Sequence, residues 1–129
     1  MKEEKLLKII NNYGVDIQQR KLAEEVWELQ EAITTHELKK SVEYEIPLAE
    51  VIGTKENIAQ ELADVMVLIE QFKLYYGITS EETVKIFWEK VDRTLERMEK
   101  WQLKSLKKEK KMENLLWEVV GNVIQHMNI

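Results

Sequence analysis

The chain has 129 residues, a net charge of −5 and no cysteine, which excludes a disulfide framework and any thiolate metal site. One third of its residues are charged, and only four glycines and one proline are present, so long helices are favoured over a turn-rich β fold. No apolar stretch has the length of a signal peptide or a membrane span. We therefore expect a cytoplasmic protein without a membrane partner.

The charge is unevenly distributed along the chain. Residues 102–112 (QLKSLKKEKKM) hold five lysines and one glutamate, or +4, which leaves −9 for the rest. Such an acidic body argues against nucleic acid as a partner. Because no aromatic residue or arginine accompanies the lysines, we interpret 102–111 as a solvated, lysine-rich helical linker.

The first two helices are predicted from periodicity and from their end signals. A helix over about residues 2–12 would end at NNYG, with Gly14 as a left-handed cap. Asp16 would cap the second helix, and Gln19 would complete a capping box. The apolar stripe of this second helix consists of Leu22, Val26, Leu29 and Ile33.

The helical pattern fades near ELKKS and resumes after a break. Residues 42–53 contain the only proline, Pro47, and then Gly53, so we interpret them as an ordered loop or a short turn of helix. Thr54 would cap a third helix that ends at Gly77. Its apolar residues alternate at spacings of four and three: Ile58, Leu62, Val65, Ile69, Phe72 and Tyr76.

Two further helices complete the expected chain. Thr79 and Glu82 have the spacing of a capping box for a fourth helix, whose buried side would be Val84, Phe87, Trp88, Val91, Leu95 and Met98. After the linker, an amphipathic helix is predicted over 112–129, and we expect it to serve in assembly. The sequence thus predicts one all-α domain, an antiparallel helical bundle over 1–101 with an additional C-terminal helix.

Two pairs of acids directly precede residues of the apolar stripes: Glu25 and Glu28 in the second helix, and Glu61 and Asp64 in the third. Because the offset is the same, antiparallel packing of these helices would bring all four to one side of the seam. Four carboxylates repel one another unless a hard divalent cation neutralises them. We therefore expect a site for Mg²⁺, with Mn²⁺ as a substitute, that assists the attack of water on a phosphate ester or anhydride.

Several polar residues near these acids have two interpretations. Glu24 reaches Glu28 across one turn, or it faces solvent and pairs with Lys21. Gln18 and Gln19 offer amides to a nucleobase, or they only cap the helix. Three cations on one face of the fourth helix, Lys90, Arg93 and Arg97, either bind phosphates or form ion pairs with Glu89, Asp92 and Glu96.

The acidic residues resemble those of a known family. EEVWE at 24–28 and ELAD at 61–64 match the EExxE and ExxD motifs of the all-α nucleoside triphosphate pyrophosphohydrolases, the MazG-like group that includes dimeric dUTPases and dCTPase-like enzymes. The stretch ENIAQELADVMVLIEQFKLYYGI is especially similar to MazG-related proteins of Gram-positive bacteria and their phages. The resemblance spans residues 16–101. It implies a helical bundle that assembles as a homodimer or homotetramer and hydrolyses a nucleoside triphosphate to monophosphate and pyrophosphate.

The resemblance also implies roles for individual residues. Glu25, Glu28, Glu61 and Asp64 would be the magnesium ligands, and Glu24 would assist them in the catalytic site. Lys90 and Arg93, in EKVDR, resemble the family's basic pair, which holds phosphates.

Two departures support an alternative from another class, a catalytically silent helical module for interaction or regulation. The gap between Glu28 and Glu61 is long for the family, and the tail beyond Trp101 has no counterpart in it. The intact set of acids favours the enzyme.

Overall fold

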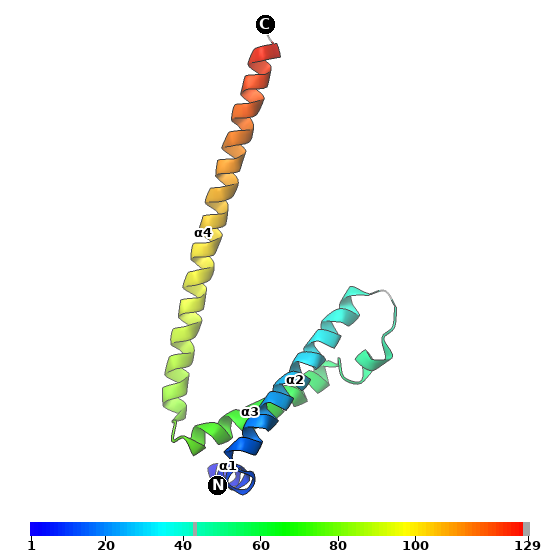
Figure 1. Ribbon diagram of the computed structural model, residues 1–129, viewed down its shortest axis with the longest axis vertical. Helices are drawn as coiled ribbons and strands as arrows, with labels where there is room; N and C mark the ends of the chain where they lie inside the picture. The colour runs from blue at the N-terminus through cyan, green and yellow to red at the C-terminus, as the bar shows by residue number, and fades with distance from the viewer. Residues whose placement is uncertain (43, 128–129) are drawn as a thin grey trace. The chain divides into compact units, whose positions relative to one another are not determined.

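The computed structural model describes residues 1–42 and 44–127. Over these residues it contains no strand, and its elements are the helices α1 (Lys2–Tyr13), α2 (Val15–Ser41), α3 (Lys55–Tyr75) and α4 (Ser80–Met127), with a short 3-10 helix, η1 (Pro47–Glu50). The predicted all-α class is therefore confirmed (Figure 1). In the described ranges, no helix has both the length and the apolar character needed to cross a membrane.

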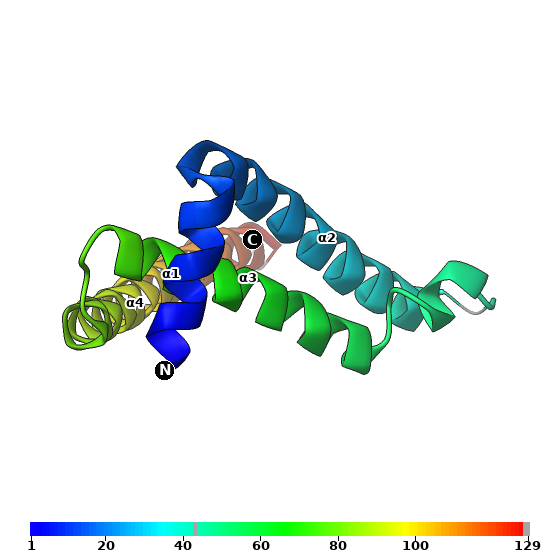
Figure 2. The ribbon, with the colours of Figure 1, turned by 90° about the horizontal axis from the view of Figure 1, so that it is seen from below.

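The chain divides into two compact units, Met1–Ser80 and the residues that follow Ser80. In the first unit, α2 and α3 lie side by side and run in opposite directions, as the sequence predicted (Figure 1). Helix α1 lies across this pair and contacts both of its members (Figure 2). The predicted site residues of α2 and α3 therefore belong to one packed unit.

A single residue, Gly14, joins α1 to α2. Its φ of 91° is positive as predicted, but its ψ of 154° is extended rather than left-handed helical, a conformation that favours glycine. The predicted cap at Asp16 is wrong, because α2 already begins at Val15 and has no side-chain cap. The Gly14 carbonyl instead accepts a hydrogen bond of 3.1 Å from the amide of Gln18.

The connection between α2 and α3 is ordered where the structure describes it. The predicted short turn of helix within 42–53 is η1, while Glu43 lies outside the described residues. The predicted cap at Thr54 is confirmed, since its Oγ1 accepts a hydrogen bond of 3.1 Å from the amide of Asn57. Helix α3 thus begins where the sequence places it.

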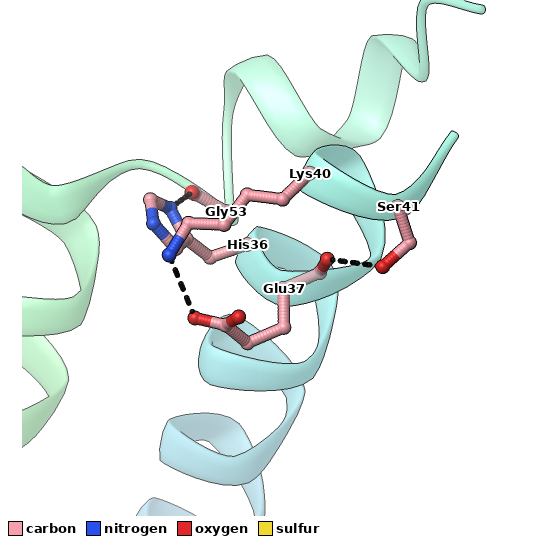
Figure 3. Close-up of polar contacts among 5 residues, drawn as sticks. All are labelled: His36, Glu37, Lys40, Ser41 and Gly53. Carbon is pink, nitrogen blue, oxygen red and sulfur yellow. Dashed lines mark hydrogen bonds and ion pairs between the residues drawn. The ribbon is translucent and has the colours of Figure 1, made fainter. Parts of the chain in front are cut away.

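The end of this connection is fixed to α2 through Gly53 (Figure 3). His36 Nδ1 donates a hydrogen bond of 2.7 Å to the Gly53 carbonyl, which gives this histidine a structural role. A Cβ atom at Gly53 would lie 3.1 Å from the backbone nitrogen of His36 and 3.0 Å from the carbonyl oxygen of Ala49. A side chain at this position would therefore push the loop away from α2 by a few tenths of an ångström, which glycine avoids.

The apolar stripes predicted for α2 and α3 are only half correct. Leu22 and Leu29 of α2 are half-buried, whereas Val26 and Ile33, from the same predicted stripe, are exposed. On α3 the buried apolar residue is Leu68, and the exposed members of the predicted stripe are Leu62, Ile69 and Tyr76. Each helix therefore has a second apolar face beside the one that packs within the unit.

Glutamine pairs with glutamine inside the α2–α3 seam. Gln18 and Gln71 are buried, and the Gln18 Nε2 donates a hydrogen bond of 2.8 Å to the Gln71 Oε1. We expect Gln71→Leu to destabilise the protein by about 1–3 kcal/mol, because the buried amide of Gln18 loses its partner. The double substitution with Gln18→Leu should recover most of this loss, as measured by denaturant unfolding. Additive losses would contradict the pairing.

The C-terminal part of the chain is not divided into separate helices as predicted. The expected fourth helix, linker and C-terminal helix form one continuous helix, Ser80–Met127. The reason is that 102–111 contains neither glycine nor proline, and lysine and leucine are good helix formers. None of the described residues of α4 is buried, so the buried side predicted for the fourth helix is exposed or only half-buried.

Candidate metal site

Three carboxylates meet across the seam between α2 and α3. Glu25, Glu28 and Glu61 each offer one oxygen, and these oxygens all lie within 4.8 Å of one another. Glu25 and Glu28 are one turn apart on α2 and share a face, and the antiparallel packing brings Glu61 of α3 to the same height. Glu25 is buried, and the other two are half-buried.

A lysine, which the sequence indicated only as a partner of Glu24, borders this cluster. The Lys21 ammonium lies 3.0 Å from Glu25 Oε1 and 3.7 Å from Glu24 Oε2. Its hydrogen bond to Glu25, together with the charges of Glu25, Glu24 and Glu28, raises the pKa of Lys21. The signal that could have revealed it is the spacing of four between Lys21 and Glu25, which places both side chains on one face of α2.

Lys21 does not provide a hydrogen-bond partner for every carboxylate oxygen of the cluster. Glu25 Oε2 and Glu61 Oε2 are buried and have no hydrogen-bond partner among the described residues. A buried carboxylate oxygen without a partner is costly, whereas a bound cation would satisfy it. A donor set of carboxylate oxygens suits Mg²⁺ or Mn²⁺, so the residues present fit the expected metal.

The surroundings of Glu28 disfavour its charged form. Burial raises its pKa above the ordinary value of 4.5, and the negative charge of Glu25, a hydrogen bond shared with Glu25 and the charge of Glu61 raise it further. An acid whose pKa is raised in the folded state makes folding less favourable as the pH rises from the unfolded pKa through the folded one.

This shift predicts how stability depends on pH. Wild type and Glu28→Gln should be equally stable below about pH 4, where residue 28 is neutral in both. As the pH rises through the raised pKa of Glu28, we expect wild type to lose stability relative to the variant. Chemical denaturation of the metal-free proteins across this range would measure the difference, and a difference that does not change with pH would contradict the shift.

The other predicted acids lie outside the group of three. Asp64 is exposed and is not one of the three acids that meet, although its spacing from Glu61 equals that between Glu25 and Glu28. Glu24 is exposed as well and pairs with Lys21, which is one of the two interpretations that the sequence left open. The role of Asp64 as a metal ligand remains a prediction, and so does the role of Glu24 as an acid that assists the ligands.

A pocket adjoins the acidic cluster on the side of α1. It has a volume of about 450 Å³, and Glu25 and Asp64 form part of its wall. The remaining lining combines apolar and aromatic side chains with amides and an ammonium: Ile9, Tyr13, Ile17, Gln18, Lys21, Val67, Leu68 and Gln71. Gln18, predicted to contact a nucleobase, lies in this wall, and its amide donates a hydrogen bond to Gln71. Gln19, for which the same role was predicted, is exposed.

The predicted phosphate ligands belong to the second unit. Lys90, Arg93 and Arg97 are exposed on α4. In the described part of the chain, none of them forms one of the ion pairs with neighbouring acids that the sequence allowed. Their role in binding phosphate remains a prediction.

Comparison with protein-family models, with curated proteins and with solved structures found no match for this chain.

Proposed function

We propose that this protein is a Mg²⁺-dependent nucleoside triphosphate pyrophosphohydrolase, which hydrolyses a deoxynucleoside or nucleoside triphosphate to monophosphate and pyrophosphate. The observation that carries the proposal is the group of Glu25, Glu28 and Glu61, with oxygens within 4.8 Å of one another. Two of these residues hold buried oxygens without partners. The resemblance of the EExxE and ExxD motifs supplies the reaction, a housekeeping step in the nucleotide pool.

The arrangement of this chain's residues suits such a substrate. A bound magnesium ion would polarise the phosphate oxygens and lower the pKa of an attacking water. The carboxylates would hold that ion at the seam, while Lys21 at the rim would attract the polyanion. The neighbouring pocket of about 450 Å³ leaves room for the nucleoside, with Tyr13 and Ile17 beside it for apolar contact.

The proposal is tested by incubating the full-length protein with each common nucleoside and deoxynucleoside triphosphate and Mg²⁺, and separating the products by chromatography. We expect monophosphate and pyrophosphate from at least one nucleotide, and no product after chelation of the metal. Release of orthophosphate and diphosphate would instead show that the reaction class is wrong.

A second candidate is the silent interaction module, which the exposure of α4 favours. None of the described residues of α4 is buried, although many of them are large and apolar. The two functions differ in their metal response, since only the enzyme needs Mg²⁺. No turnover of any nucleotide, together with no change in melting temperature on adding Mg²⁺, would favour the module.

A further inference from the structure

Many apolar residues of α4 follow a heptad pattern in the N-terminal part of the helix and again in its C-terminal part. With Val84 as the first d position and Trp88 as the first a position, the core positions of the pattern hold Val84, Trp88, Val91, Leu95 and Met98, and later Met112, Leu116, Val119 and Val123. Apart from Val91, each of these side chains is at least half exposed. A 48-residue helix is about 72 Å long, and two exposed apolar stripes of this kind, Val84 to Met98 and Met112 to Val123, need a partner.

The pattern keeps its phase through the lysine-rich stretch. Met98 and Met112 both occupy d positions, two heptads apart, although the stretch between them is mostly polar. A mere spacer would not need to preserve this phase. The lysines of the stretch all lie off the core, at b, c, f or g positions: Lys100, Lys104, Lys107, Lys108, Lys110 and Lys111.

We propose that α4 forms a parallel, in-register coiled coil with α4 of a second copy of this chain. The interface would run from Val84 to about His126. This inference does not depend on the proposed hydrolase activity, because it rests on α4 alone.

The residues that flank the core select a second copy in parallel orientation. In a parallel coil, a g residue faces the e residue five positions later in the other chain. Lys108 then faces Glu113, and the charges attract. Trp101 faces Leu106 in the same way, and both side chains are apolar.

Of the polar core positions at the centre of α4, Gln102 favours the same arrangement and Glu109 opposes it. Gln102 would meet Gln102 of the second copy at an a position, where paired amides can hydrogen-bond and fix the register. Glu109 also occupies an a position, so two carboxylates would approach each other there. Lys108 of the second copy flanks each of them, because the residue just before an a position borders the opposite a layer.

Antiparallel packing of two copies is less favourable. The heptad pattern allows two antiparallel alignments in which α4 overlaps over nearly its full length. In one of them Asp92 lies opposite Glu113, twice by symmetry. In the other, Glu99 lies opposite Glu113, and Lys108 lies opposite itself. Like charges in these flanking positions oppose association.

Single cysteines test the orientation, since the natural chain has none. His126→Cys and Ser105→Cys both place a thiol at a d position, whereas Lys107→Cys places it at an outer f position as a matched control. We expect the first two full-length variants to form disulfide-linked dimers in a glutathione redox buffer, and the control to remain reduced. A linked dimer with Ser105→Cys alone would indicate antiparallel packing, and none with either core variant would mean no coiled coil; both results overturn the proposal.

Charge reversal tests the pairing itself. Lys108→Glu places like charges against Glu113 and Glu109 of the second copy, and we expect it to weaken dimerisation by about tenfold. Adding Glu113→Lys should restore the affinity, whereas Lys107→Glu, with the same charge change at an f position, should leave it unaltered. Sedimentation equilibrium would measure all four proteins. Equal effects of Lys108→Glu and Lys107→Glu would overturn the proposal.

Discussion

Glu28→Gln and Glu61→Gln are expected to reduce nucleotide hydrolysis by at least about a hundredfold, because each removes a carboxylate that would hold the metal. The same substitutions should leave the melting temperature of the metal-free protein unchanged or raise it. The reason is that Glu25, Glu28 and Glu61 bring their oxygens within 4.8 Å of one another, and neutralising one of them relieves repulsion.

Magnesium should reverse the order of stability. At a hundredfold excess over its dissociation constant, Mg²⁺ should stabilise wild type by about 2.7 kcal/mol for a single site. The two variants should gain distinctly less, since they bind the ion more weakly. Calorimetry with and without Mg²⁺, on the same samples as the hydrolysis assay, would measure both effects.

A neighbouring acid provides the matched control. Glu24 is exposed and lies beside the cluster, so Glu24→Gln removes the same charge without removing one of the three converging carboxylates. We expect it to keep most of the metal response. Asp64→Asn then decides whether the exposed fourth acid of the motif is a ligand. Equal metal responses in wild type, Glu28→Gln and Glu61→Gln would show that these carboxylates do not form one site.

The sequence predicted the elements of the first unit better than their burial. Thr54 and the single proline located the start of α3 and the short helix before it, because capping and proline geometry are local properties. Burial is not local, since it depends on which of two apolar faces the neighbouring helix covers. For this reason Val26 and Leu62 were assigned to the packed side, although both are exposed.

The acidic cluster was predictable because its spacing repeats in two helices with the same offset. Two of its details were not. Lys21 borders the cluster, which its spacing of four from Glu25 allowed but did not require. Asp64 is exposed, although it has the same spacing from Glu61 as Glu28 has from Glu25. The helical character of 102–111 was predicted, but its continuity with the helices on both sides was not, because a polar, lysine-rich stretch has the composition of a linker and also of an exposed helix face.

Lys21→Met should lower the melting temperature of the metal-free protein and at the same time strengthen its binding of Mg²⁺. Without metal, the Lys21 ammonium, 3.0 Å from Glu25 Oε1, is the cation that neutralises a buried carboxylate. Removing it leaves that carboxylate unpaired, which is costly for a buried charge. The loss is the opposite of the gain expected for Glu28→Gln.

Metal binding should improve because Lys21 and a divalent ion compete for the same oxygens. Removing one positive charge beside the site should raise the affinity for Mg²⁺ by roughly tenfold, and saturating metal should return the variant close to wild-type stability. Titration calorimetry gives the affinity, and thermal melts with and without Mg²⁺ give the stability.

Lys40→Met is the matched control for Lys21→Met. It removes an ammonium 3.0 Å from Glu37 in an exposed pair on the same helix, which should change the free energy of unfolding by less than about 0.5 kcal/mol and leave metal binding unaltered. If Lys21→Met instead weakened Mg²⁺ binding, the ammonium would assist the ion rather than replace it. If both lysine variants behaved alike, Glu25 would not depend on Lys21 for its charge balance, and the cluster would lack the electrostatic strain on which the proposed metal site rests.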